Sequence, residues 1–62
     1  MAKSIVAKTS ISAGTILSED NLTYKSPSGG LPPYEIDNVI GKVTLVDLEE
    51  DDLINLENIK SI

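Results

Sequence analysis

Aliphatic residues fall along the chain in short, β-branched groups that are separated by polar turns. Residues 4–11 and 42–48 are the two longest of these groups, and each predicts a strand. Residues 15–17, 23–25 and 53–54 predict shorter extended pieces. No apolar spacing of helical period extends far enough for a long helix, so the pattern predicts a mainly β chain.

The polar segments between these strands predict turns and brief helices. Residues 18–22 combine a capping serine with acidic residues, which indicates a single helical turn, and residues 55–59 repeat that pattern. Apolar spacing over residues 34–40 predicts about two helical turns that end at Gly41. Residues 26–33 hold three prolines and two glycines, and they predict a loop.

The two ends of the chain resemble each other when the sequence is shifted by 37 residues. Each copy consists of a strand, a tight turn, an apolar pair and a polar turn that ends in Asn and an aliphatic residue. The matched pairs are Val6 and Val43, Ile11 and Leu48, Ile16 and Leu53, Leu17 and Ile54, Asp20 and Glu57, Asn21 and Asn58, and Leu22 and Ile59. Chance agreement among common aliphatic residues is the alternative. Because one such unit cannot bury its apolar face alone, we expect the two copies to pack about a pseudo-two-fold axis.

The core is expected to be aliphatic, since the chain has no Phe or Trp and its aromatic residues are Tyr24 and Tyr34. A chain of 62 residues buries only about 60% of the surface that its unfolded form exposes, so this core is marginal. The residues predicted to form it are Val6, Ile11, Ile16, Leu22, Val43, Leu48, Leu53 and Ile59.

The composition excludes most catalytic chemistry within this chain. His, Cys and Arg are absent, which rules out a histidine base, a cysteine nucleophile, an arginine clamp, disulfides and thiolate-bound zinc. Ten acids against five lysines give a formal net charge of −5, which disfavours binding to nucleic acid or to anionic lipid. No apolar run approaches the ~20 residues of a membrane span, and no apolar region of a secretory signal follows the first residues. We therefore expect a cytoplasmic domain.

The acids of segment 47–52 are the most conspicuous candidate for chemistry. When the segment is aligned as a calcium loop from Asp47, Asp52 stands where glycine is required and Asn58 where the last glutamate is required, so the calcium interpretation fails. Adjacent acids on a turn are normally solvated, and we interpret the cluster as a charged turn that keeps an edge soluble. Residues 29–30 lack the Lys-Ser/Thr partner of a phosphate loop and are interpreted as a bend.

Several segments of the chain resemble a known family. The opening of a SAF domain, also called an antifreeze-like domain, is similar to residues 4–8 (SIVAK), 11–17 (IxxGTIL) and 19–22 (ExNL). Three further segments are more specific to one branch of the family. They resemble the C-terminal domain of bacterial sialic acid synthases and of their pseudaminic and legionaminic acid relatives, and they are 30–36 (GLPPYEI), 39–42 (VIGK) and 48–54 (LEEDDLI). The likeness runs from Lys3 to about residue 56, which is nearly the whole chain.

The resemblance implies a β-clip fold, with short strands, single-turn helices and internal two-fold similarity, in one domain over residues 1–62 that is the C-terminal part of a larger synthase. In such enzymes a metal-dependent β/α barrel condenses phosphoenolpyruvate with an N-acetylated hexosamine, and the antifreeze-like domain of one subunit covers the barrel mouth of the other. The implied partners are therefore the barrel of a homodimer and the hexosamine substrate. The manganese or magnesium ion belongs to the barrel, so neither a cofactor nor a catalytic residue is expected within this chain.

Lys3 is the residue to which the resemblance assigns a substrate contact. From the sequence alone it is a surface lysine just before the first strand, where a linker from a preceding domain would enter. Many synthases of the family place an arginine directly before the serine that opens this domain, and that arginine contacts the N-acyl group of the sugar from across the dimer. Lys3 matches that position, and a lysine acts there as a point donor in place of a planar fork.

Two other functions stay open at the level of the sequence. Fish type III antifreeze proteins share the implied fold, and the matching surface holds the uncharged residues Thr9, Thr15, Ser18 and Asn21. The acids at 19–20 oppose an ordered water interface, because charged side chains are costly to desolvate. The other alternative is the SAF domain of a different sugar-acid enzyme or of a flagellar or pilus assembly protein, against which the 30–42 segment argues.

Overall fold

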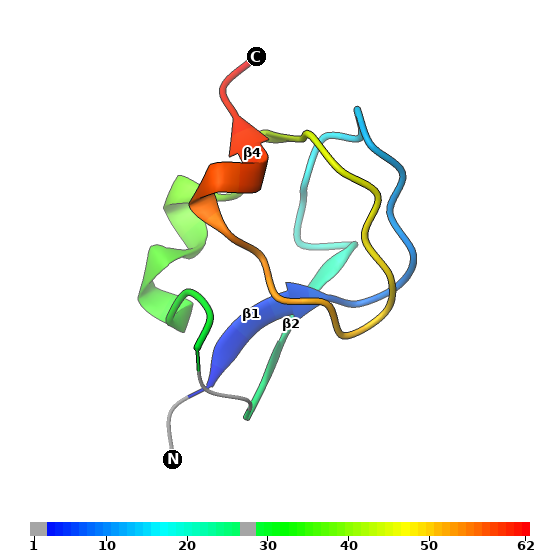
Figure 1. The fold of residues 1–62 in the computed structure, drawn as a ribbon. Helices are drawn as coiled ribbons and strands as arrows, with labels where there is room; N and C mark the ends of the chain where they lie inside the picture. Colours follow the sequence, from blue (N-terminus) through cyan, green and yellow to red (C-terminus); the bar gives the residue numbers. More distant parts are fainter. Residues whose placement is uncertain (1–2, 27–28) are drawn as a thin grey trace.

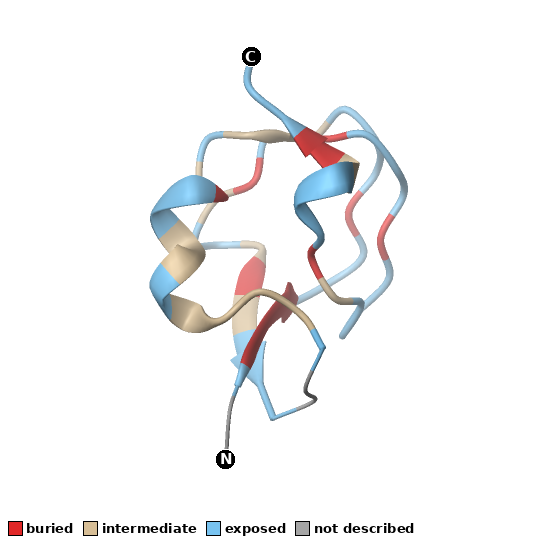
Figure 2. Ribbon diagram, turned by 60° about the vertical axis from the view of Figure 1, so that its left-hand side comes forward, coloured by how far each residue is buried: buried red, intermediate tan, exposed pale blue. Residues whose placement is uncertain are grey.

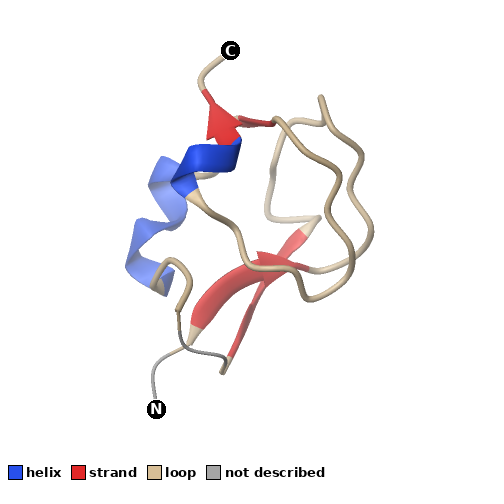
Figure 3. Ribbon diagram, in the orientation of Figure 1, coloured by secondary structure: helices blue, strands red, loops and turns tan. Residues whose placement is uncertain are grey.

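The computed structural model describes residues 3–26 and 29–62, in which regular secondary structure is sparse (Figure 1, Figure 3). Four short strands form two antiparallel pairs: β1 (Ser4–Ala7) with β2 (Leu22–Lys25), and β3 (Val43–Thr44) with β4 (Ile59–Lys60). Two 3-10 helices precede β3 and β4: η1 (Pro33–Asn38) and η2 (Leu56–Asn58). Turns and extended loops make up the remainder, so the mainly β prediction is confirmed. Pro27 and Ser28, within the predicted 26–33 loop, lie outside the described residues, as do Met1 and Ala2.

The predicted internal repeat relates the two strand pairs to each other. In the first pair Ala7 lies opposite Leu22, and in the second pair Thr44 lies opposite Ile59. Adding 37 to the numbers of the first two residues gives the numbers of the second two. The two copies therefore share one register as well as a sequence pattern.

Backbone hydrogen bonds between the copies follow the same rule. The matched residues Ile11 and Leu48 exchange both of their backbone hydrogen bonds, with N···O distances of 2.8 and 2.7 Å, which places this pair on the pseudo-two-fold axis. The 37-residue shift also converts one further backbone bridge into another: the bridge of Val6 with Leu53 becomes the bridge of Val43 with Ile16. The expected packing of two copies about a pseudo-two-fold axis is thus confirmed.

The tight turn of each copy holds a residue with positive φ at the same place in the repeat. Gly14 has a φ of 91° and its N–H donates to the carbonyl of Thr44 at 2.8 Å. Asp51, its counterpart, has a φ of 72° and its N–H donates to the carbonyl of Ala7 at 2.8 Å. Glycine adopts this conformation at no steric cost, and aspartate is among the residues that tolerate it. The backbone of the acidic turn therefore helps to join the two copies of the repeat.

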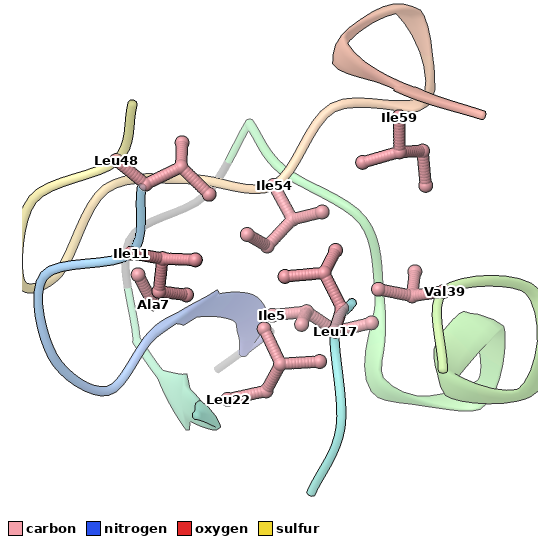
Figure 4. Close-up of a cluster of buried hydrophobic side chains, with 9 residues drawn as sticks. All are labelled: Ile5, Ala7, Ile11, Leu17, Leu22, Val39, Leu48, Ile54 and Ile59. Carbon is pink, nitrogen blue, oxygen red and sulfur yellow. The ribbon is translucent and has the colours of Figure 1, made fainter. Parts of the chain in front are cut away.

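Aliphatic side chains from both copies form a single core. The side chains of Ile5, Leu17 and Ile54 occupy its middle (Figure 4). The members of the cluster are Ile5, Ala7, Ile11, Leu17, Leu22, Val39, Leu48, Ile54 and Ile59, and Val6 is buried as well. Five predicted core residues are therefore confirmed: Val6, Ile11, Leu22, Leu48 and Ile59.

Ile16 was predicted to lie in the core, and that prediction is wrong, because its side chain is 52% exposed. The buried member of this apolar pair is Leu17, at 0%, and the buried member of the matched pair is Ile54, at 1%. Consecutive side chains of an extended segment point to opposite sides, so only one residue of each pair can face the core. Val43 and Leu53, also predicted as core residues, are only partly buried.

Every residue of β1 is buried, which the alternation of apolar and polar residues did not predict (Figure 2). Strand β2 pairs along one edge of β1, and residues 31, 51, 52 and 54 donate or accept backbone hydrogen bonds along the other edge. Because β1 is covered on all sides, Ile5 and Ala7 belong to the core although they are adjacent to Val6.

The regular elements are shorter than predicted. The strand expected over residues 4–11 ends at Ala7, and the strand expected over 42–48 is regular only at Val43–Thr44. The Thr44 hydroxyl donates to the Val46 carbonyl at 2.8 Å and accepts the Val46 N–H at 3.3 Å, so a local bend replaces the strand ladder there. The helix expected over 34–40 is the 3-10 helix η1, and its C-cap Val39 packs in the core.

Candidate functional site

Lys3 is exposed and immediately precedes β1, whose start lies at the opposite end of the molecule from β4 (Figure 1). Its neighbour Ser4 is only 2% exposed, and the Ser4 Oγ accepts the Gly30 N–H at 3.3 Å. The Ile5 N–H donates to the Leu31 carbonyl at 2.9 Å. The lysine ammonium is thus presented to solvent from a strand end that is itself held in place, and it offers up to three hydrogen-bond donors to an acceptor.

The family resemblance predicts a substrate contact for Lys3, whereas the contact that holds the next residue was not predicted. The sequence predicts Ser4 as part of a strand and residues 29–30 as a bend. One feature of the sequence points to such a contact: Ser4 opens a run of aliphatic residues that is expected to be buried, and a buried hydroxyl needs a hydrogen-bond partner.

Three of the five acids of segment 47–52 are engaged in local structure through their side chains. The Asp47 Oδ1 accepts the Ala13 N–H at 2.8 Å, and the Asp52 Oδ2 accepts the Glu49 N–H at 2.8 Å. Asp51 forms an ion pair with Lys25, with Oδ1 and Nζ 3.2 Å apart on half-exposed side chains. Across residues 3–26 and 29–62, no group of three or more acidic side chains is arranged to hold a metal ion, and no pocket is enclosed.

We expect calcium to leave the stability of the chain unchanged. The carboxylates of Asp47 and Asp52 already accept backbone N–H groups, so a cation would have to compete with these bonds. Thermal melts in excess EDTA and in millimolar calcium should superimpose. An upward shift of several degrees with calcium would identify segment 47–52 as a metal site, because a ligand that binds only the folded state raises Tm.

Two of the four uncharged residues considered for ice binding are engaged in turn hydrogen bonds. The Ser18 N–H donates to the Asn21 Oδ1 at 2.9 Å, and the Asn21 Nδ2 donates to the Ile16 carbonyl at 3.3 Å. Thr9 is exposed, whereas Thr15, Ser18 and Asn21 are half-buried. Formation of the turn therefore explains the presence of Ser18 and Asn21 without a role in ice binding. The acids at 19–20 beside them are exposed.

Among the described residues, no helix has the length and apolar character that crossing a bilayer would require.

The SAF domain family matches residues 2–60 of the chain. A mouse N-acetylneuraminate-9-phosphate synthase is 47% identical over 62 residues, which are 98% of this chain and 17% of the mouse protein. The human N-acetylneuraminate-9-phosphate synthase is 51% identical over 55 residues, which are 87% of this chain and 15% of the human protein. An N,N'-diacetyllegionaminic acid synthase from Campylobacter jejuni is 42% identical over 52 residues, which are 84% of this chain and 16% of that protein. The chain thus spans about a sixth of the length of these relatives.

Two solved structures share the fold. The solution structure of an antifreeze protein like domain in human N-acetylneuraminic acid phosphate synthase has a TM-score of 0.87 at 47% identity, and it covers 95% of this chain and 76% of the human domain. The crystal structure of the flagellar protein FlgA from Thermotoga maritima has a TM-score of 0.78 at 20% identity, over 97% of this chain and 25% of that one. The likeness to FlgA concerns the fold alone.

Proposed function

The chain belongs to the SAF domain family, and from this premise we propose that it is the substrate-capping, non-catalytic domain of a sialic (nonulosonic) acid synthase. The observation that carries the proposal is identity of 42–51% to parts of three proteins that are named as such synthases. The fold alone would not carry it, because a flagellar protein shares that fold.

In the proposed enzyme, a barrel outside this chain condenses phosphoenolpyruvate with an N-acetylated hexosamine and holds the divalent metal, manganese or magnesium. The present domain covers the barrel mouth of the partner subunit in a homodimer. With phosphoenolpyruvate as a substrate, the cytoplasm is the proposed compartment. The chain has no His, Cys or Arg, which fits a domain that contributes shape and a donor but no general base or nucleophile.

Lys3 is the proposed substrate-binding residue of this domain. It is exposed at the start of β1, and its ammonium can donate to the oxygen of the N-acyl group. A donor at this place would distinguish an N-acylated sugar from one with a free amine, since a positive charge attracts the acyl oxygen and repels an ammonium group.

We expect the full-length protein and the 62-residue chain to differ in a phosphate-release assay. The full-length protein should release inorganic phosphate from phosphoenolpyruvate only when an N-acetylated hexosamine and manganese are present. The 62-residue chain under the same conditions should release none, because it holds no barrel. Turnover by the 62-residue chain, or a full-length protein that is inert with every N-acetylated hexosamine, would contradict the proposed function.

A further inference from the structure

The start of β1 is fixed by a contact with the segment that enters η1. Ser4 is polar and yet 2% exposed, and its Oγ accepts the Gly30 N–H at 3.3 Å. The next residue continues the attachment, since the Ile5 N–H donates to the Leu31 carbonyl at 2.9 Å. Ser4 also lies opposite Lys25 in the pair of β1 with β2. The residue directly after Lys3 is therefore held by its pairing with β2 and by the contact of its side chain with Gly30.

Gly30 lies so close to Ser4 that a side chain at position 30 would crowd its neighbours. A Cβ added at position 30 would lie 3.0 Å from the Ser4 Cβ and 2.8 Å from the Leu53 Cδ2. The Leu53 Cδ2 is the end of a flexible side chain and can move, whereas the Ser4 Cβ is attached directly to the backbone and would have to shift by a few tenths of an ångström. Glycine at position 30 thus permits the close approach of the two segments, and a larger residue there would displace Ser4 slightly.

The attachment ends at Ser4, and the exposed Lys3 comes next. A lysine side chain is long and loses much rotamer freedom when it is held in one place. A point donor on such a side chain reaches a fixed acceptor reliably only if its own Cα is held in position.

We infer that the Ser4–Gly30 contact holds Lys3 in position, and that it thereby strengthens the hydrogen bond of Lys3 to the N-acyl group of the hexosamine. The inference rests on the proposed function. Ser4 and Gly30 act through Lys3, so they are positioning residues and touch no reacting atom.

A buried hydroxyl can also serve stability alone, and the chain offers a matched control for that role. Thr44 is 0% exposed, and its hydroxyl bonds to the backbone of Val46 at 2.8 and 3.3 Å. It lies in β3, within the other copy of the repeat. Thr44→Val removes a buried hydroxyl without touching the start of β1.

The test uses the full-length protein with phosphoenolpyruvate and an N-acetylated hexosamine, and it measures KM for each substrate together with Tm. Ser4→Ala should raise the hexosamine KM by about threefold to tenfold and leave that of phosphoenolpyruvate unchanged, because a misplaced donor weakens one contact. In a Lys3→Ala background, Ser4→Ala should raise the hexosamine KM no further. Thr44→Val should lower Tm and leave both KM values unchanged. Ser4→Cys, which keeps the size of the side chain, replaces Ser4→Ala if the alanine variant does not fold.

Two results would overturn the inference and leave the proposed function standing. One is a rise in hexosamine KM from Ser4→Ala that is equally large with and without Lys3. The other is an equal rise from Thr44→Val, since both results would indicate a general loss of structure. A hexosamine KM that Lys3→Ala itself leaves unchanged would overturn the proposed contact, and the positioning inference with it.

Discussion

Leu17→Ala should lower the free energy of unfolding by about 2–5 kcal/mol, which is the range for truncating a buried leucine. Leu17 is 0% exposed and lies in the middle of the core, beside its matched residue Ile54 (Figure 4). Small domains have about 5–15 kcal/mol of stability at most, and a chain of 62 residues belongs at the low end. Urea unfolding at 25 °C should show a large drop in midpoint, or a variant that is unfolded without denaturant.

The adjacent residue provides the control. Ile16 is an aliphatic residue of the same size, but its side chain is 52% exposed. Ile16→Ala should therefore change the free energy of unfolding by about 0.5 kcal/mol or a little more. Equal losses from Leu17→Ala and Ile16→Ala would mean that the core is not the one described here.

Lys3→Ala should raise the hexosamine KM of the full-length protein by about tenfold to hundredfold, because a hydrogen bond from a charged donor is lost. The KM for phosphoenolpyruvate should stay nearly unchanged, since the proposed contact is with the sugar alone. Folding should be unaffected, because Lys3 is exposed and lies ahead of the first strand. Steady-state kinetics with each substrate varied in turn will measure both constants.

Two further substitutions make this result specific. Lys3→Arg should retain a low hexosamine KM, because arginine also donates and presents a planar fork to the acyl oxygen. Lys60→Ala removes another exposed lysine, from β4 at the far end of the molecule, and should leave both KM values unchanged (Figure 1). A rise in hexosamine KM from Lys60→Ala would indicate that net charge, and not the position of Lys3, governs binding.

The internal repeat is the part of the fold that the sequence predicted best. Ile11 and Leu48 match under the 37-residue shift, and in the structure they bond to each other on the pseudo-two-fold axis. A sequence shift reveals this symmetry because both copies must bury the same face. It does not reveal which residue of an apolar pair faces inward, and for that reason Ile16 was predicted in the core in place of Leu17.

The candidate site could be predicted only in part. Lys3 was identified through the family resemblance, and from the residues alone it is an ordinary surface lysine. The contact of Ser4 with Gly30 joins residues 26 positions apart, and no local pattern of apolar and polar residues encodes such a pair. The apolar spacing over residues 34–40 does mark Val39, but it does not show that this end of the short helix packs into the core.

Mixed dimers test most directly the proposal that this domain acts on the active site of the partner subunit. One subunit carries Lys3→Ala with an intact barrel, and the other carries Lys3 with an inactivated barrel. The Lys3→Ala homodimer should show the raised hexosamine KM, and the mixed dimer should regain the low KM of the wild type at its single working barrel. A mixed dimer that keeps the raised KM would contradict capping across the dimer.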